Sequence, residues 1–301
     1  MKPVFSSLPA VVLAKAGVTT GLFFVVLLSL SAQNRYYVNA AATGTNNGQS
    51  WADAFIDLQA ALQTAQTGDE VWVAEGTYYP TDSTDRKVSF EPLSGTKLYG
   101  GFAGTEISLG QRDWVAHPAV LSGDIGILGD STDNVYNVVY LLEPDTNTLL
   151  DGFVIRDGVA NNGGALPSRD RKRCGGGLYI MGQDGDAYPD IRNCVFIHNS
   201  ATAFGGGVMM NGGGQGSVAP RFVNCRFEQN HAVASGGGAA RFGGSWIERG
   251  DDFAGCVFLQ NRANYRGGGF YYTDTERNDR KVQPCMSNRS SHHTRPHPCS
   301  P

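Results

Sequence analysis

The sequence is poor in charged residues, and beyond residues 1–32 it has no long apolar run. Charged residues make up 17% of the 301 residues, and the formal net charge is −4. This acidic balance disfavours nucleic acid as a partner, because phosphate recognition requires a basic face. A membrane-spanning helix takes about 20 consecutive apolar residues. We therefore predict no transmembrane span in the mature chain.

Glycine is in excess, with 40 residues, while 41% of the chain is hydrophobic. An apolar fraction of this size is ordinary for a globular protein and argues against a disordered chain. Glycine therefore serves the geometry of the backbone, at bends and at left-handed positions.

Residues 1–32 are typical of a secretory signal peptide. Lys2 and Lys15 supply positive charge, residues 17–30 form a short apolar stretch, and Ser31 and Ala32 are small residues suited to cleavage. We therefore predict an exported protein, located outside the cell or on the bacterial outer surface.

A heptapeptide phrase recurs three times at a constant interval, at residues 193–199, 224–230 and 255–261. Each phrase is followed by a glycine triplet, and a further triplet stands at residues 175–177. A period of about 30 residues with Cys-x-Phe alternation is typical of one turn of a β-solenoid. We expect three inward or corner rows to stack from turn to turn: Cys194, Cys225 and Cys256; Phe196, Phe227 and Phe258; and Asn199, Asn230 and Asn261.

The predicted fold is all-β, a right-handed parallel β-helix (solenoid) with a short N-terminal capping helix. Residues 33–69 hold a strand and this helix, with Ser50 as its N-cap and Gly68 after its end. Residues 70–275 form the β-helix, with upstream strands at 70–74, 97–101, 135–142 and 149–155. Residues 276–301 are polar and proline-rich, so we expect a disordered tail and a truncated or frame-shifted chain.

The six cysteines permit disulfides in an exported protein, but a buried thiol also packs well as a small apolar group. We favour free, buried thiols over bridges for the three repeated cysteines, because a flat row of stacked residues makes the disulfide dihedral hard to reach. The disulfide state of Cys174, Cys285 and Cys299 stays open.

Several segments resemble bacterial right-handed parallel β-helix repeat proteins of the pectin-lyase-like superfamily. They include residues 36–39, 47–54 and 68–78, and the match continues at 98–106, 121–124 and 150–153. The Gly-Gly-Gly and Phe-x-x-Asn pairs resemble the repeat of polymorphic outer-membrane proteins, although the third glycine replaces the alanine of that pattern. The resemblance implies a surface or secreted protein.

Candidate functional residues are few, and we assign no catalytic residue. Asp184, Asp186 and Asp190 cluster around Gly185 and form a candidate calcium site, the one cofactor considered. A second acidic group, Asp124, Asp130 and Asp133, lies in a glycine-rich stretch where Asp is also common for local hydrogen bonding.

We expect a structural, adhesive or glycan-binding role, with cell-surface or extracellular glycans or proteins as partners. The aromatic residues considered for stacking on sugars are Tyr78, Tyr79, Trp246 and Tyr265. The alternative is a polysaccharide lyase or glycoside hydrolase acting on acidic polysaccharides, because β-helix folds also carry such enzymes.

Overall fold

The computed structural model describes residues 33–163, 168–213, 216–243 and 253–273. Within them the regular structure is mostly β-strand, with one α-helix and two short 3-10 helices. The strands form four sheets in which neighbouring strands are parallel. This confirms a mostly β fold with parallel strands. The predicted signal peptide (1–32), the predicted tail (276–301) and Trp246 lie outside the described residues.

The sheets are named here A to D. Sheet A contains β1 (Arg35–Val38), β2 (Glu70–Ala74), β4 (Lys97–Phe102), β7 (Leu149–Asp151), β11 (Asp190–Arg192), β15 (Arg221–Val223) and β19 (Phe253–Ala254). Sheet B contains β3 (Gly76–Tyr78), β5 (Ala119–Ser122), β8 (Phe153–Arg156), β12 (Val195–Ile197), β16 (Arg226–Glu228) and β20 (Val257–Leu259). Sheet C contains β6 (Val139–Leu142), β10 (Leu178–Met181), β14 (Val208–Asn211), β18 (Ala239–Phe242) and β22 (Phe270–Thr273). Sheet D contains β9 (Val159–Ala160), β13 (Ser200–Ala201), β17 (His231–Ala232) and β21 (Arg262–Ala263).

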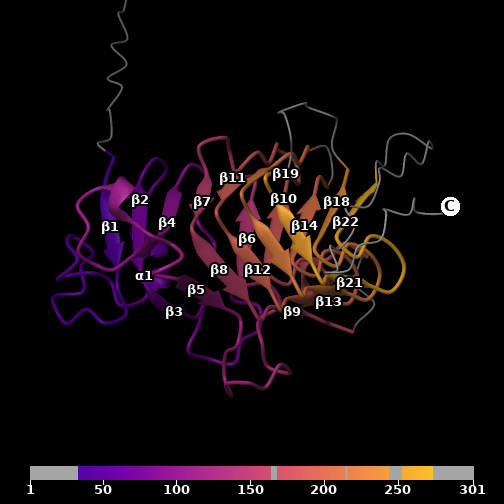
Figure 1. The fold of residues 1–301 in the computed structure, drawn as a ribbon, viewed down its shortest axis with the longest axis horizontal. Helices are drawn as coiled ribbons and strands as arrows, with labels where there is room; N and C mark the ends of the chain where they lie inside the picture. Colours follow the sequence, from indigo (N-terminus) through magenta and orange to yellow (C-terminus); the bar gives the residue numbers. More distant parts are fainter. Residues whose placement is uncertain (1–32, 164–167, 214–215, 244–252, 274–301) are drawn as a thin grey trace, which may run out of the picture. The chain divides into compact units, whose positions relative to one another are not determined.

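From β7 onward the chain passes through sheets A, B, D and C in turn and then starts again in sheet A. One such set of four strands is called a rung here. In every sheet the strands are neighbours in the order in which the chain makes them, as the labels β3, β5, β8 and β12 show in Figure 1. Consecutive rungs therefore lie directly beside each other.

Apolar side chains from these sheets fill a continuous interior. Phe196 stacks on Phe227 with a centroid distance of 5.1 Å, and Phe227 stacks on Phe258 at 4.5 Å. A second stacked pair, Phe222 and Phe253 at 5.0 Å, meets Phe227 edge to face. Burying an aromatic ring in this way stabilises the fold by about 1.5–3 kcal/mol.

A row of buried asparagines runs beside the phenylalanines. Nδ2 of Asn199 donates to Oδ1 of Asn230 at 3.1 Å, and Nδ2 of Asn230 donates to Oδ1 of Asn261 at 2.9 Å. Each Oδ1 also accepts the backbone N–H of the asparagine one rung earlier. The buried amides are thus paired, as buried polar groups must be.

The glycine triplets stand where the chain enters sheet C. Gly205 has a φ of 62°, a left-handed conformation that favours glycine. A Cβ added at Gly206 would lie 2.3 Å from the carbonyl oxygen of His231. The triplet therefore allows the backbones of neighbouring rungs to approach closely.

The α-helix is shorter than predicted. Helix α1 spans Leu58–Thr64, and its N-cap is Asp57, whose carboxylate accepts the N–H of Gln59. The prediction that Ser50 caps the helix is wrong, because the Ser50 hydroxyl instead donates to Asp53 at 3.1 Å within a turn. The buried side chains of α1 belong to the same interior cluster as those of β2, and the helix contacts β1 and β2.

Trp51 takes no part in the helix. It packs with its ring 4.8 Å from Tyr37 and 5.4 Å from Phe102, and its Nε1 donates to the carbonyl of Glu106. Trp51 and Phe55 have helical spacing but pack in different clusters, which explains why spacing alone misplaced the start of the helix.

Two upstream strands also differ from the prediction. The expected strand at 149–155 divides into β7 and β8, because Gly152 has a φ of 84° and turns the chain from sheet A to sheet B. The expected strand at 135–142 is regular only in β6, at Val139–Leu142.

No helix in the described part of the chain is long and apolar enough to cross a membrane.

Candidate functional site

The strands of sheet B end at one common corner, where a row of residues follows their carboxyl ends. The register pairs Ser122 with Arg156, Arg156 with Ile197, and Ile197 with Glu228. The next residue of each rung therefore occupies the same corner position. These residues, called the corner row here, are Gly123, Asp157, His198, Gln229 and Gln260.

The last three residues of the corner row are linked by side-chain hydrogen bonds. His198 contacts Oε1 of Gln229 through Nε2, and Nε2 of Gln229 donates to Oε1 of Gln260 at 2.8 Å. Asp157, His198, Gln229 and Gln260 all have a left-handed backbone, with φ between 51° and 63°. This conformation is uncommon for residues with a Cβ and gives all four the same corner geometry.

Asp157 has an unusual environment for a carboxyl group. Burial raises its pKa, and the carboxylate of Asp124 raises it further, while Arg156, with Nε 3.3 Å from Oδ2 of Asp157, and His198 lower it. The net shift is upward. Asp157 thus keeps its proton more readily than an ordinary aspartate, and it lies close to a second carboxylate.

A groove opens beside this corner, between α1, the end of β3 and the loop after β5. Its volume is about 660 Å³. The carboxylate and amide residues that line it are Asp57, Gln59, Gln63, Asp82 and Asp124, and the lining also includes Tyr79 and Leu128. We call this cavity the α1 groove. Asp124, which lines the groove, directly follows Gly123 of the corner row.

The α1 groove combines an aromatic ring, amides and carboxylates. Tyr79 is 36% exposed, and Leu128 is 68% exposed. Gln59 is held in place because its Nε2 donates to the carbonyls of Pro80 and Ser89. The described residues lining the groove include no lysine or arginine. The groove therefore has an acidic lining without a paired cation, and it offers both an apolar contact and hydrogen-bonding groups.

The sugar-stacking candidates separate in the structure. Tyr79 lines the α1 groove, whereas Tyr78 is 3% exposed and its hydroxyl donates to the carbonyl of Ala74. Burial raises the pKa of Tyr78 to about 12. Tyr265 is 80% exposed and lies in the last described rung, far along the sequence from the groove. Tyr78 also lines the groove, so Tyr79 is the candidate that both lines the groove and is exposed.

The three residues of the predicted calcium site have separate partners. The N–H of Asp184 donates to Glu143, Oδ1 of Asp186 accepts the N–H of Ser217, and Oδ2 of Asp190 pairs with Arg192. Across the described residues no group of three or more Asp, Glu, His or Cys side chains is arranged to hold a metal ion.

The second acidic stretch, 124–133, is held by local hydrogen bonds. Both oxygens of Asp124 accept the N–H of Gly129, Asp130 accepts from Thr132, and Asp133 accepts the N–H of Ile127. Of the three, Asp124 alone lines the α1 groove.

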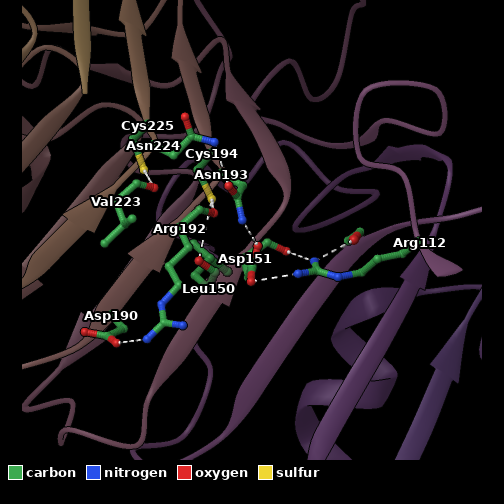
Figure 2. A network of polar contacts seen from close by, with 11 residues as sticks. Arg112, Leu150, Asp151, Asp190, Arg192, Asn193, Cys194, Val223, Asn224 and Cys225 are labelled. Atoms are coloured by element: carbon green, nitrogen blue, oxygen red, sulfur yellow. Dashed lines mark hydrogen bonds and ion pairs between the residues drawn. The ribbon is translucent and has the colours of Figure 1, made fainter. Parts of the chain in front are cut away.

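A further polar network connects three neighbouring strands of sheet A. Figure 2 shows Asp151 between Arg112 and Asn193. Nη2 of Arg112 lies 2.7 Å from Oδ2 of Asp151, and Nδ2 of Asn193 donates to Oδ1 of Asp151 at 2.8 Å. Asn224 then donates to Asn193. Because the side chains of Arg112 and Asp151 are only 9% and 7% exposed, this network is structural.

Sequence reasoning considered Asp124 but missed Asp157 and the α1 groove. Asp157 follows the predicted strand ending at Ile155, but no motif marks it. The signal that identifies it is its register with His198, one residue before Asn199 of the repeat.

Comparisons of the chain with protein-family models, with curated proteins and with solved structures find no match.

Proposed function

We propose that this protein is an exported right-handed parallel β-helix of the pectin-lyase-like type that binds glycans through the α1 groove. The 31-residue spacing of bonded asparagines and the repeated passage through sheets A, B, D and C support the β-helix. Parallel strands joined by crossovers are right-handed in about 98% of cases, which supports the handedness. The signal-like residues 1–32 support export.

The observation that carries the binding role is the composition of the α1 groove. Carbohydrates bind where an aromatic face covers the apolar face of the sugar and where fixed amides and carboxylates bond its hydroxyls. Tyr79 supplies the ring, Gln59 and Gln63 supply amides, and Asp57 and Asp82 supply carboxylates.

The charge of the groove selects the class of glycan. Carboxylates without a lining lysine or arginine repel uronates and accept neutral sugars or sugars bearing an amine. The protein therefore binds neutral or amino oligosaccharides in preference to the acidic polysaccharides expected for a lyase.

The test is calorimetric titration of the full chain with a neutral glucan hexasaccharide, a chitosan hexamer and a hexagalacturonate. We expect binding of the first two and none of the third. Tyr79→Ala weakens binding about twofold to tenfold, since an aromatic contact contributes about 0.5–1.5 kcal/mol, whereas Tyr79→Phe retains it. Tyr265→Ala is the matched control, because Tyr265 is exposed outside the groove. Equal binding of all three glycans, or no effect of Tyr79→Ala, contradicts the proposal.

One observation favours a second candidate, glycoside hydrolysis. Asp157, with its raised pKa, is suited to donate a proton to a leaving oxygen, and neighbouring Asp124 is suited to act as the base or nucleophile. New reducing ends released from the bound oligosaccharide would support this activity. Asp157→Asn and Asp124→Asn should each abolish such release, while Asp130→Asn should retain it.

A further inference from the structure

Cys225 and Cys256 stand directly opposite each other on neighbouring rungs. The register pairs Arg226 with Val257, so the residues before them are also aligned. Paired parallel strands are about 4.8 Å apart, and disulfide-linked cysteines have Cα atoms about 4.4–6.8 Å apart. The Cα spacing of the two rungs therefore lies within the disulfide range, and side-chain rotation at the half-buried Cys256 has to supply the dihedral that a flat row disfavours.

The stacked cysteines differ in their access to solvent. Cys194 and Cys225 are buried, with exposed fractions of 0% and 1%, whereas Cys256 is half-buried and follows the exposed Gly255. Figure 2 shows the sulfurs of Cys194 and Cys225 bonded to the carbonyls of Arg192 and Val223. A reagent in solution thus meets Cys256 before the other two.

The pKa of Cys256 is shifted in the direction opposite to that of Cys225. Its sulfur accepts the backbone N–H of Cys225 at 3.4 Å. Hydrogen bonding by the Cys225 thiol and by this N–H lowers the pKa of Cys256, and burial opposes the change only in part. Burial holds the pKa of Cys225 well above the ordinary value. The thiolate, which is the reactive form, therefore forms more readily at Cys256 than at Cys225.

We propose that Cys256 and Cys225 form a thiol–disulfide exchange site that takes low-molecular-weight disulfides such as oxidised glutathione. All the described cysteines, Cys174, Cys194, Cys225 and Cys256, are free thiols in the structure. The structure therefore shows the Cys225–Cys256 site in its reduced, dithiol form. This property is independent of glycan binding, because neither cysteine lines the α1 groove.

The exchange has two steps. The Cys256 thiol loses its proton, its sulfur attacks one sulfur of oxidised glutathione, and the released glutathione thiolate takes up a proton. The Cys225 thiol then loses its proton and attacks Cys256 in the mixed disulfide, releasing the second glutathione as a thiol. Two protein thiols are oxidised to one disulfide, and one glutathione disulfide is reduced to two thiols. The product links the last two described rungs covalently.

The other described cysteines do not compete. Cys194 is fully buried one rung further from Cys256. Cys174 belongs to a different apolar cluster, and burial raises its pKa to about 12.

The test uses the full chain with Cys285→Ser and Cys299→Ser, so that the cysteines outside the described residues do not react. Oxidised glutathione is added at pH 8, and the products are mapped by mass spectrometry. We expect a transient glutathione adduct on Cys256 and then a Cys225–Cys256 crosslink. Cys225→Ser should stop the reaction at the adduct, Cys256→Ser should abolish both products, and Cys194→Ser, the matched control, should change neither.

Alkylation of the same chain with iodoacetamide needs no further substitution and so does not depend on the folding of the cysteine variants. We expect Cys256 to react at least about tenfold faster than Cys194 or Cys225. Equal alkylation rates, or a glutathione adduct on Cys256 that persists without a crosslink, would overturn the proposal.

Discussion

Oδ1 of Asn230 accepts two hydrogen bonds from Asn199, one from its side-chain amide at 3.1 Å and one from its backbone N–H at 3.0 Å. Asn230 is 0% exposed, so these bonds are shielded from solvent in the folded protein. A single side chain therefore satisfies backbone and side-chain groups of its neighbour on the preceding rung.

We predict that Asn230→Ala lowers the free energy of unfolding by about 3 kcal/mol, because it leaves buried donors on Asn199 unpaired. Gln229→Ala, one residue earlier, removes only exposed hydrogen bonds and should cost less than about 1 kcal/mol. Urea denaturation followed by circular dichroism measures both. Equal losses in the two variants would show that the asparagine row does not contribute specially to stability.

We predict that Gly206→Ala destabilises the protein by about 2–3 kcal/mol, because the added Cβ meets the carbonyl oxygen of His231 at 2.3 Å. Gly110→Ala is the matched control. No atom lies within 4 Å of a Cβ at that position, so the change should be neutral or slightly stabilising. Thermal unfolding of both variants checks the prediction, and a neutral Gly206→Ala would contradict the close approach of the rungs.

We predict that Arg112→Ala costs about 3–5 kcal/mol of unfolding free energy, because it leaves the carboxylate of Asp151 buried without its cation. Arg226→Ala removes the exposed ion pair with Glu228 and should cost less than about 1 kcal/mol. A double-mutant cycle with Asp151→Ala measures the coupling of Arg112 and Asp151 in chemical denaturation. Additive effects of the two substitutions would contradict a direct interaction.

Ionisation of Asp157 should lower the stability of the fold, whereas ionisation of most aspartates raises it. Its pKa in the folded state is raised, chiefly by burial, so its ionisation opposes folding. The stability it contributes is present below the unfolded pKa and is lost as the pH rises through the folded pKa. Asp157→Asn should therefore make the protein at least as stable as the unsubstituted chain at pH 7, with less gain at pH 3.

Asp130 provides the contrast for this measurement. Hydrogen bonds from Thr132 lower its pKa, so its contribution is present at neutral pH and is lost as the pH falls through the lowered value. Melting temperatures of Asp157→Asn and Asp130→Asn between pH 3 and pH 7 should change in opposite directions relative to the unsubstituted chain.

His117 should titrate above the ordinary histidine value of 6.5, because its Nδ1 lies 2.8 Å from Oε2 of Glu75 and the hydrogen bond favours the charged ring. The stability from this pair is present at low pH and is lost as the pH rises through the raised pKa of His117. Glu75→Gln should lower the midpoint measured by NMR titration, and Glu143→Gln, a carboxylate elsewhere, should leave it unchanged. A midpoint unaffected by Glu75→Gln would exclude the contact.

The parallel β fold was predictable because the constant spacing of the repeat fixes which residues pair between neighbouring strands. Cys194, Phe196 and Asn199 recur at one spacing, and strand pairing at that spacing brings equal residues together. The start of α1 was not predictable from periodicity. Trp51 and Phe55 satisfy helical spacing as well as Leu58 does, but the carboxylates of Asp53 and Asp57 bind local backbone groups and place the N-terminus later.

The candidate site was less accessible to sequence reasoning. The α1 groove joins residues near 57, 80 and 125, which become neighbours only when α1, the end of β3 and the loop after β5 pack together. The corner row has no residue type common to all its members, because Asp157, His198 and Gln229 occupy one position with three different side chains. A search for recurring residue types detects inward positions, where packing restricts which side chains fit. It misses outward positions, where contact with solvent permits many residue types.

The strict alternation along β12, β16 and β20 constrains how the gene can change in length. Duplication of a whole 31-residue unit would extend every sheet by one strand and preserve each contact above and below it. Insertion of one residue within such a strand would instead turn its phenylalanine toward solvent and a polar neighbour toward the interior. Only a change in length by complete repeats therefore preserves these contacts, and length changes of other sizes are compatible with them in the connections between strands.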